Sequence, residues 1–375
     1  MKLMDDVRAL VPAAVVALMT ALAPVASAQA PASEPAISDK PVADDRYPER
    51  RITFPGGVTG LPDVTYAARP GFRPLALDLY LPPDSASNQK SPPNAGFPLI
   101  VHIHGGGWSA GHARHAAAFA DFPAVLASIA ARGYVVASVN YRLAGEAPSP
   151  AQVMDIKTAV RWLRAKAGAY RIDPARVALW GESAGGHLAA LTAATCGVDA
   201  YDPVTLPPPG SVDPEGRPLT STLPPEVAGQ TDCVQCAVAW YGLFDFTTVP
   251  QETDKRDHPV MTASAAYLGC ELDRCQPGLA EGASPVTYVD ADTPPMLLIH
   301  GTADELHSPK QSEAMAAELK KAGVSTELAL LDGVGHSLIG RTPDDTRAAS
   351  LKALDSTLRF FDRTLRKESR AQAGQ

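Results

Sequence analysis

The feature that most constrains the fold of this chain is a Gly-Glu-Ser-Ala-Gly segment, residues 181–185, between two apolar runs. The run before it, 177–180, is typical of a buried strand, and the Ala-rich run after it, 186–195, is typical of a helix. A strand that turns at Gly-x-Ser-x-Gly and enters a helix holds its serine in a strained backbone, with Oγ exposed at the end of a sheet. The segment therefore predicts an α/β sheet that presents Ser183 as a nucleophile.

A glycine-rich loop follows another apolar strand. Residues 99–103 are typical of a buried strand and lead directly into His104-Gly105-Gly106-Gly107-Trp108. Because glycines leave backbone N–H groups uncovered, these groups can approach a negatively charged oxygen closely. We expect Gly106 and Gly107, together with Ala184 after the serine, to donate the hydrogen bonds of an oxyanion hole.

The two motifs, His104-Gly105-Gly106-Gly107-Trp108 and Gly181-Glu182-Ser183-Ala184-Gly185-Gly186-His187, together resemble the α/β-hydrolase superfamily. More narrowly, they are similar to those of hormone-sensitive-lipase-like esterases and of the related bacterial feruloyl-esterase-like (BD-FAE type) carboxylesterases. The resemblance covers about residues 75–365 and includes three scaffold segments, 139–143, 155–163 and 172–177. It implies an α/β-hydrolase fold and a triad in the order serine, acid, histidine.

Two later strands supply an acid and a base in that order. Residues 296–300 predict a buried strand followed by Asp304, and residues 326–331 predict the next strand, followed by His336. Catalytic groups in open α/β sheets gather at the carboxyl ends of strands, so Asp304 and His336 are expected to meet Ser183. His336 would accept the proton of Ser183 Oγ, and Asp304 would hold the imidazole in the correct tautomer.

Both residues have competitors in the sequence. For the acid, Glu305 is adjacent, and Asp245 follows the preceding strand, where some hydrolases place the carboxylate. The Gly-x-x-Asp pattern favours Asp304. For the base, His307 is too close along the chain to bridge acid and nucleophile and is expected to be a surface histidine. His187, one turn into the helix after the serine, is expected to pack or to interact with the helix dipole.

A group of histidines raises the alternative of a metal site. His102 and His104 alternate onto one face of a strand, and His112 and His115 follow in the next loop. Three glycines stand where a dinuclear zinc hydrolase would need an aspartate and a further histidine, so we expect no metal. Neither a dinucleotide-binding Gly-x-Gly-x-x-Gly nor a phosphate-loop lysine is present, so we expect no cofactor.

The order of elements predicts an α/β fold with a mostly parallel eight-stranded sheet, helices on both faces and an antiparallel start. A helix is predicted over 149–167, with Ser149 as its N-cap, Pro150 in its first turn and an apolar face. The predicted strands are 64–68, 76–81, 99–103, 134–140, 177–180, 237–241, 296–300 and 326–331.

The domain organisation follows from the two ends of the sequence. The charged start of the chain precedes an apolar run that ends in small residues, as in a secretion signal cleaved after Ala28 or Ala30. Pro12 and Pro24 interrupt this run, so we expect no stable membrane insertion and a secreted or periplasmic protein. The expected parts are a signal over 1–28, an extended segment over 29–60, a catalytic domain over 61–366 and a polar tail over 367–375.

The five cysteines agree with export. Cys270 and Cys275 bracket a short loop, and Cys196 and Cys233 flank a proline-rich excursion over 203–225, so we expect two disulfides. Cys236 lies in a predicted strand and is expected to be a buried free thiol. The excursion is either part of the active-site mouth or a plain surface loop.

The overall composition narrows the possible partners. The net charge is −8, and no basic cluster interleaves with aromatic residues, so nucleic acid is not an expected partner. The oligomeric state is not indicated. Trp108 is expected to place its indole near the mouth of the site, as a substrate contact. An aromatic content of 6% provides little apolar surface for docking on lipid, which argues against an interfacial lipase.

The sequence therefore predicts a serine carboxylesterase that hydrolyses small water-soluble esters through an acyl-enzyme. One alternative is a feruloyl or acetyl esterase acting on plant polysaccharide decorations. The alternative from another class is a catalytically inactive hydrolase-fold binding module, which the intact serine, acid, base and glycine loop disfavour.

Overall fold

The described part of the chain is defined by a computed structural model and comprises residues 50–68, 73–83, 85, 96–203, 223–253 and 257–366. Four predicted segments lie wholly or mostly outside it: the signal over 1–28, the tail over 367–375, the extended segment over 29–60 and the excursion over 203–225. Their predicted roles remain predictions. None of the helices within the described ranges has the length and hydropathy of a membrane span.

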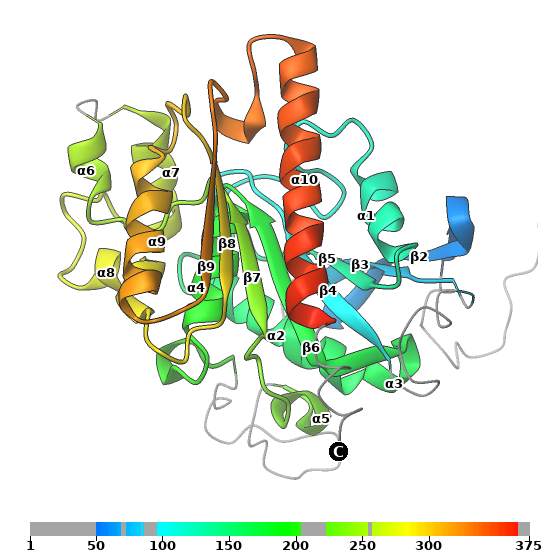
Figure 1. The fold of residues 1–375 in the computed structure, drawn as a ribbon. Helices are drawn as coiled ribbons and strands as arrows, with labels where there is room; N and C mark the ends of the chain where they lie inside the picture. Colours follow the sequence, from blue (N-terminus) through cyan, green and yellow to red (C-terminus); the bar gives the residue numbers. More distant parts are fainter. Residues whose placement is uncertain are drawn as a thin grey trace, which may run out of the picture. The chain divides into compact units, whose positions relative to one another are not determined.

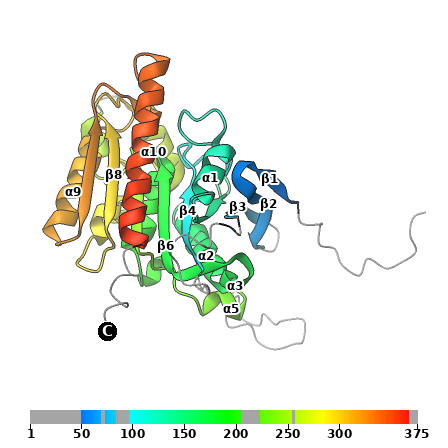
Figure 2. The ribbon, with the colours of Figure 1, turned by 45° about the vertical axis from the view of Figure 1, so that its right-hand side comes forward.

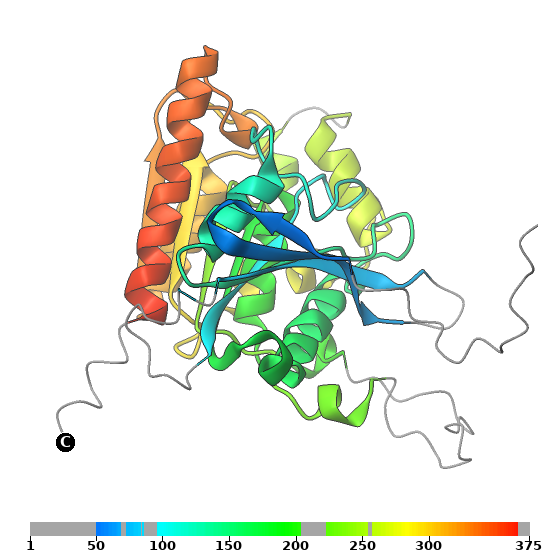
Figure 3. The same cartoon turned by 90° about the vertical axis from the view of Figure 1, so that its right-hand side faces the viewer.

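Nine strands of the described residues form one sheet in the order β1-β2-β3-β5-β4-β6-β7-β8-β9 (Figure 1). The pairings from β1 to β3 and between β3 and β5 are antiparallel, and the remaining pairings are parallel. Figure 3 shows the antiparallel end of the sheet toward the viewer. The strands are β1 (Ile52–Phe54), β2 (Val58–Ala67), β3 (Leu75–Leu81), β4 (Phe97–Ile103), β5 (Val135–Val139), β6 (Ile172–Glu182), β7 (Cys236–Trp240), β8 (Met296–Gly301) and β9 (Thr326–Leu331).

Helices cover both faces of this sheet (Figure 1, Figure 2). α1 and α10 pack on one face, and α2, α4 and α9 pack on the other. Alternate residues of β6 enter the two cores: Leu179 faces α2 and α4, while Trp180 faces α1 and α10. The helices are α1 (Phe122–Ala130), α2 (Ala151–Ala165), α3 (Ala167–Tyr170), α4 (Ala184–Ala194), α5 (Pro225–Ala228), α6 (Val249–Glu252), α7 (Pro259–Leu268), α8 (Leu279–Ala283), α9 (Lys310–Lys321) and α10 (Pro343–Leu365).

The predicted mostly parallel sheet with an antiparallel start is confirmed, and all eight predicted strands are present. The prediction of eight strands is wrong by one, because β1 adds a ninth in the stretch assigned to an extended segment. β1 has only three residues, too few to show a period of two in the sequence. Its pairing with β2 comes from the chain reversal at Pro55–Gly57.

One detail of the predicted helix over 149–167 is wrong. α2 has the predicted apolar face, but Ser149 does not cap it, since Pro150 occupies the N-cap position and no side chain bonds there. The backbone N–H of Ser149 instead donates to the carbonyl of Tyr267 at 2.7 Å. A tertiary contact with α7 therefore replaces the local cap that the sequence pattern predicts.

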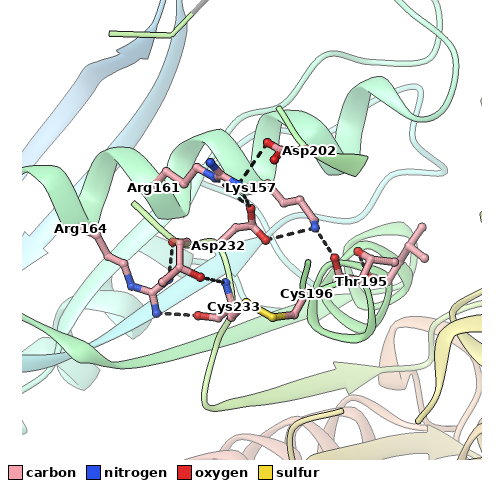
Figure 4. Close-up of a disulfide and its surroundings, with 10 residues drawn as sticks. Lys157, Arg161, Arg164, Thr195, Cys196, Asp202, Asp232 and Cys233 are labelled. Carbon is pink, nitrogen blue, oxygen red and sulfur yellow. Dashed lines mark hydrogen bonds and ion pairs between the residues drawn. A yellow bond between two sulfur atoms is a disulfide. The ribbon is translucent and has the colours of Figure 1, made fainter. Parts of the chain in front are cut away.

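Both predicted disulfides are present, Cys196–Cys233 and Cys270–Cys275, and Cys236 is a buried free thiol. The first bond joins the end of α4 to the segment before β7. Figure 4 shows that this bond lies beside a group of buried charges.

The cations beside Cys196–Cys233 come from α2, and the carboxylate of Asp232 comes from the segment before β7. Asp232 accepts hydrogen bonds from Lys157 at 3.1 Å and from Arg161 at 2.7 Å, and Arg164 donates to the carbonyl of Cys233 at 2.6 Å (Figure 4). A buried cation without its counterion is strongly destabilising. Arg161 also pairs with Asp202 at 3.1 Å, so two carboxylates balance Lys157 and Arg161. The disulfide holds in place one of them, the Asp232 carboxylate that contacts both cations.

We expect the two disulfides to stabilise the fold unequally, because they close loops of 37 and 5 residues. Chain entropy predicts that replacing both Cys196 and Cys233 with serine costs about 4 kcal/mol, against about 2 kcal/mol for Cys270 and Cys275. Urea unfolding would measure both losses. A larger loss for the short loop would contradict the chain-entropy explanation.

The cysteine pairing can be checked by labelling. In the wild type, alkylation of the unfolded chain without reductant should label one cysteine of five by intact mass. Three labels would show that one disulfide is absent.

Candidate active site

Ser183 lies at the turn between β6 and α4, with φ 53° and ψ −122°. A positive φ in a residue with a side chain costs about 1–3 kcal/mol and persists only where the surroundings impose it. Here the N–H of Ser183 donates to the carbonyl of Trp240 in β7 at 2.9 Å, and its own carbonyl accepts from the N–H of His187 at 3.0 Å. The turn therefore has the strained backbone that the motif predicts.

The two glycines of the motif are required by close backbone contacts. A Cβ on Gly181 would lie 2.2 Å from the carbonyl oxygen of Gly185, and a Cβ on Gly185 would lie 2.0 Å from that of Ile103 in β4. Both distances are far below van der Waals contact. The tight turn thus exists only because these two positions carry no side chain.

The structure brings Ser183, His336 and Asp304 together from the carboxyl ends of three strands. His336 Nε2 lies 3.0 Å from Ser183 Oγ, and His336 Nδ1 lies 2.8 Å from Asp304 Oδ2. An ionised carboxylate only accepts hydrogen bonds, so Nδ1 carries the proton and Nε2 is free to accept one from the serine. This is the geometry of a nucleophile activated by a general base.

Asp304 is held in its ionised form. Its Oδ1 accepts from the N–H groups of Leu306 and His307, each at 2.9 Å. Burial opposes ionisation, but hydrogen bonds from His300 and His336 outweigh it and hold the pKa of the Asp304 carboxyl well below its usual range. The negative charge that a catalytic imidazolium needs is therefore present at neutral pH.

The competing acids do not reach the imidazole. Asp245 accepts hydrogen bonds from the backbone and the hydroxyl of Thr247, two residues away in its own loop. Glu305 is exposed beside Asp304. Within the described part of the chain, neither carboxylate hydrogen-bonds to His336, so the geometry favours Asp304.

His307 differs from its prediction as a surface histidine, because it is buried, with 5% of its surface exposed. Its Nδ1 donates to the carbonyl of Tyr241 at 3.0 Å, and its ring packs edge-on against that of His336 with centroids 4.8 Å apart. Burial lowers the pKa of His307 to about 3. The loop after β8 folds back on the Asp304 carboxylate and carries His307 inward, which the local sequence does not reveal.

His300 contacts the acid, a role that the sequence patterns above did not indicate. Its Nε2 lies 3.0 Å from the carbonyl of His307 and 3.3 Å from Asp304 Oδ2, and its Nδ1 lies 2.7 Å from the hydroxyl of Ser312. The signal was available, since a histidine in an apolar strand needs partners for both nitrogens. His300 supports the acid and the loop that contains it.

Glu182 has a function inside the motif that the sequence analysis did not assign. Its Oε1 accepts from the N–H of Gly105 at 2.8 Å, and its Oε2 lies 2.9 Å from His102 Nε2. His102 Nδ1 in turn lies 3.0 Å from the hydroxyl of Ser138. This carboxylate therefore ties the glycine loop to the turn at Ser183.

The four histidines weighed as metal ligands have other surroundings. His102 contacts Glu182 as described, and the His104 Nδ1 lies 2.7 Å from the carbonyl of Gly105. The rings of His112 and His115 lie 6.3 Å apart in the following loop. No group of three or more potential metal ligands occurs among the residues that the structure describes.

The glycine loop runs beside the nucleophile. A Cβ on Gly105 would lie 3.2 Å from that of Ser183, and Gly106 and Gly107 have φ values of 109° and 58°. The N–H groups of Gly106, Gly107 and Ala184 donate to no other described residue. These three donors are thus available for an oxyanion at the serine.

Trp108 corrects the prediction of an indole at the mouth of the site. Its side chain is completely buried, stacks on Tyr267 with centroids 4.7 Å apart and donates from Nε1 to His187 Nδ1 at 3.1 Å. The large apolar surface of an indole is more stable in the core than at an open mouth. Trp108 is therefore a core residue of the glycine loop rather than a substrate contact.

This chain matches one family model and is similar to several known esterases. The BD-FAE family model matches residues 77–319, which include Ser183 and Asp304. Esterase LipQ of Mycobacterium tuberculosis is 30% identical over 70% of this chain and 53% of the relative. The probable carboxylic ester hydrolase LipM of the same organism is 29% identical over 60% and 45%. The chain thus spans about half the length of these curated relatives.

Solved structures of similar fold extend the comparison. A truncated carbohydrate esterase from gut microbiota is 27% identical, with a TM-score of 0.62 over 82% of this chain and 97% of the other. The esterase Est2 of Thermogutta terrifontis is 25% identical, with a TM-score of 0.55 over 80% and 90%. These likenesses confirm the predicted α/β-hydrolase fold.

The geometry predicts a sharp difference between the two candidate acids. Replacing Asp304 with asparagine should lower kcat by about 10⁴, because an amide leaves the wrong tautomer of His336. Asp245→Asn should lower kcat less than threefold, since the described hydrogen bonds of the Asp245 carboxylate go to Thr247 in its own loop. Steady-state kinetics on an aryl ester would give both values. The opposite ranking would assign the acid to the loop after β7.

The buried histidines predict that stability falls in acid. Burial lowers the pKa of His104 to about 3, of His187 to about 4 and of His307 to about 3, so the unfolded chain binds more protons than the native chain below pH 6.5. Their contribution to stability is complete above about pH 6.5 and is lost progressively as the pH falls toward the native pKa values of about 3 to 4. Urea titrations should show a loss of at least about 2 kcal/mol between pH 7 and pH 5.

The matched control for this pH dependence is His112→Asn, which changes an exposed histidine and should leave the dependence unaltered. His104→Asn should reduce it. Equal stability of the wild type at pH 7 and pH 5 would show that these histidines are not held neutral.

Proposed function

Since this chain belongs to the BD-FAE family of α/β-hydrolases, we propose that it is a serine carboxylesterase that hydrolyses small, water-soluble esters through an acyl-enzyme. The hydrogen-bonded chain from Ser183 through His336 to Asp304 carries this proposal. Its relatives LipQ and LipM are esterases, which supports the same reaction class.

The geometry supports a two-step reaction. Ser183 Oγ attacks the ester carbonyl carbon while His336 Nε2 takes its proton, and the N–H groups of Gly106, Gly107 and Ala184 bind the resulting oxyanion. Each such donor typically lowers the barrier by about 3 kcal/mol. The bond to the alcohol then breaks, His336 returns the proton to the leaving oxygen, and the acyl group stays on Ser183.

Deacylation repeats these roles with water as the nucleophile. His336 takes a proton from water, the hydroxide attacks the acyl carbon, and the acid leaves as Ser183 regains its proton. Asp304 remains ionised throughout and stabilises the imidazolium of both steps. Every proton transfer in the two steps therefore passes through His336.

The substrate is proposed to be compact. A cavity of about 350 Å³ lies beside the loop of Asp304, between that loop, α6 and the start of α7, and its lining includes Leu243, Val260 and Glu252. Its described lining includes neither Ser183 nor His336, and the support for a compact substrate is the aromatic content of only 6%, which offers little apolar surface to lipid. Acetyl or feruloyl esters on plant polysaccharides remain the second candidate, supported by the similarity to the gut carbohydrate esterase. The complete triad disfavours an inactive binding module.

We propose a secreted or periplasmic location. The two disulfides support it, because such bonds persist in oxidising compartments. Small-molecule esters are the proposed partners, and the net charge of −8 disfavours nucleic acid.

A panel of p-nitrophenyl esters with acyl chains of two to twelve carbons, together with methyl ferulate, tests the proposal. We expect kcat/KM to peak at about two to four carbons, because each further CH₂ gains about 0.8 kcal/mol only where a pocket receives it. A steady rise of kcat/KM to twelve carbons would contradict the proposed substrate class.

Variants of the nucleophile and the base test the mechanism. Ser183→Ala and His336→Ala should each lower kcat by about 10⁴ to 10⁶, and the double variant should be hardly worse. If Ser183→Ala kept a tenth of the wild-type activity, the mechanism would be wrong.

A further inference from the structure

His187 connects three segments of the candidate active site. It lies on α4, one turn after Ser183. Its Nδ1 accepts a hydrogen bond from the indole Nε1 of Trp108 at 3.1 Å, and its Nε2 donates to the carbonyl of Ala283 at 2.9 Å. Trp108 directly follows Gly107, and Ala283 is the last residue of α8.

These partners determine the protonation of His187. An indole N–H only donates and a carbonyl only accepts, so Nδ1 is unprotonated and Nε2 carries the hydrogen. Burial lowers the pKa of this imidazole to about 4, so the ring stays neutral near pH 7. Both of its nitrogens are therefore used, and a phenyl ring of similar shape could replace neither bond.

Aromatic rings enclose the imidazole. Its centroid lies 5.3 Å from that of Trp108 and 5.2 Å from those of Phe246 and Tyr267, edge-on to all three. These side chains are fully buried. Tyr267 belongs to α7, which also approaches the glycine loop, since a Cβ on Gly107 would lie 3.5 Å from that of Ala263. The loop therefore lies between the helix of the nucleophile and the α7–α8 segment.

We propose that His187 is a positioning residue for the oxyanion hole: through Trp108 it holds the N–H groups of Gly106 and Gly107 in place, and its bond to Ala283 fixes the tautomer that accepts from Trp108. The inference rests on the proposed esterase function, because it assigns those N–H groups to a tetrahedral intermediate. A displacement of about 1 Å in such donors can cost about 100-fold in rate. The hydrogen bond to Trp108 prevents this displacement.

Three variants separate the two bonds of His187. His187→Phe removes both while keeping a ring, and Trp108→Phe removes the indole donor while keeping the stack on Tyr267. His187→Asn keeps an acceptor near the Nδ1 position and loses the donor to Ala283. The matched control is Trp180→Phe, which removes a buried indole whose Nε1 has no partner among the described residues.

Kinetics and a transition-state mimic distinguish positioning from a general loss of structure. We expect His187→Phe and Trp108→Phe to lower kcat about 10- to 100-fold with KM changed less than threefold. Binding of an aryl trifluoromethyl ketone, which forms a tetrahedral adduct with the serine, should weaken by the same factor. The double variant should be no worse than the more damaging single one. His187→Asn should stay within about fivefold of the wild type, and Trp180→Phe within about threefold.

The inference is overturned if His187→Phe and Trp108→Phe keep kcat within threefold, if their losses multiply in the double variant, or if kcat falls while the ketone binds as before. Urea unfolding checks that each variant is folded. If His187→Phe does not fold, Trp108→Phe and His187→Asn carry the same comparison.

A readout independent of ester hydrolysis separates this inference from the proposed function. In protein labelled with ¹⁵N-tryptophan, the indole N–H resonance of Trp108, assigned by its loss in Trp108→Phe, should move upfield in His187→Phe. An unmoved resonance overturns the hydrogen bond on which the inference depends. A wild type that hydrolyses no ester of the panel, with the resonance shifting as expected, overturns the proposed function and with it the role in an oxyanion hole, while the bond between His187 and Trp108 stands.

Discussion

The strained turn at Ser183 is the constraint on which the rest of the site depends. Its positive φ is imposed by β7 on one side, through the carbonyl of Trp240, and by α4 on the other. Gly181 and Gly185 permit the approach of the surrounding backbone to distances that no side chain allows. Because the neighbouring strands are parallel, the glycine loop, the acid and the histidine all emerge at the same edge of the sheet. The parallel sheet therefore brings the candidate catalytic groups to the edge at which the turn presents Ser183.

Buried histidines organise the surroundings of this turn. His187 and His307 each donate to a backbone carbonyl and join segments that are distant in the sequence. Burial lowers the pKa of both rings, so both are neutral near pH 7. His300 lies 3.0 Å from the carbonyl of His307, beside the acid. Neutral imidazole suits this role because it supplies one donor and one acceptor in a rigid ring. His102 and His300 also contact a carboxylate and a serine hydroxyl, but their serines are Ser138 in β5 and Ser312 in α9. The proposed base, His336, is distinguished by its hydroxyl partner, which is Ser183 at the strained turn.

The ion pairs around Asp232 also join segments that are distant in the sequence, away from the candidate site. Asp232 and Asp202 balance the charges of Lys157 and Arg161 in α2, and the disulfide between Cys233 and Cys196 attaches the segment of Asp232 to the end of α4. α4 begins at the nucleophile. The same helix is therefore anchored at both ends, by the turn at Ser183 and by the covalent bond near its C-terminus. Both anchors restrict the movement of the serine relative to the sheet.

The sequence by itself determined the α/β class and the parallel strands, because strand periodicity and the Gly-x-Ser-x-Gly turn act over a few residues. The choice of Ser183, Asp304 and His336 came with the family resemblance, which implies their order along the chain. The two disulfides followed from which cysteines flank the same loop. Only the tertiary structure decided the burial of Trp108 and His307, the loss of the Ser149 cap and the addition of β1. β1 is decided by its hairpin with β2, since three residues are too few to show a strand period. For Trp108, His307 and Ser149 the physical reason is a contact with a distant segment, such as α7 over Trp108 or the carbonyl of Tyr241 at His307, which outweighs the local preference.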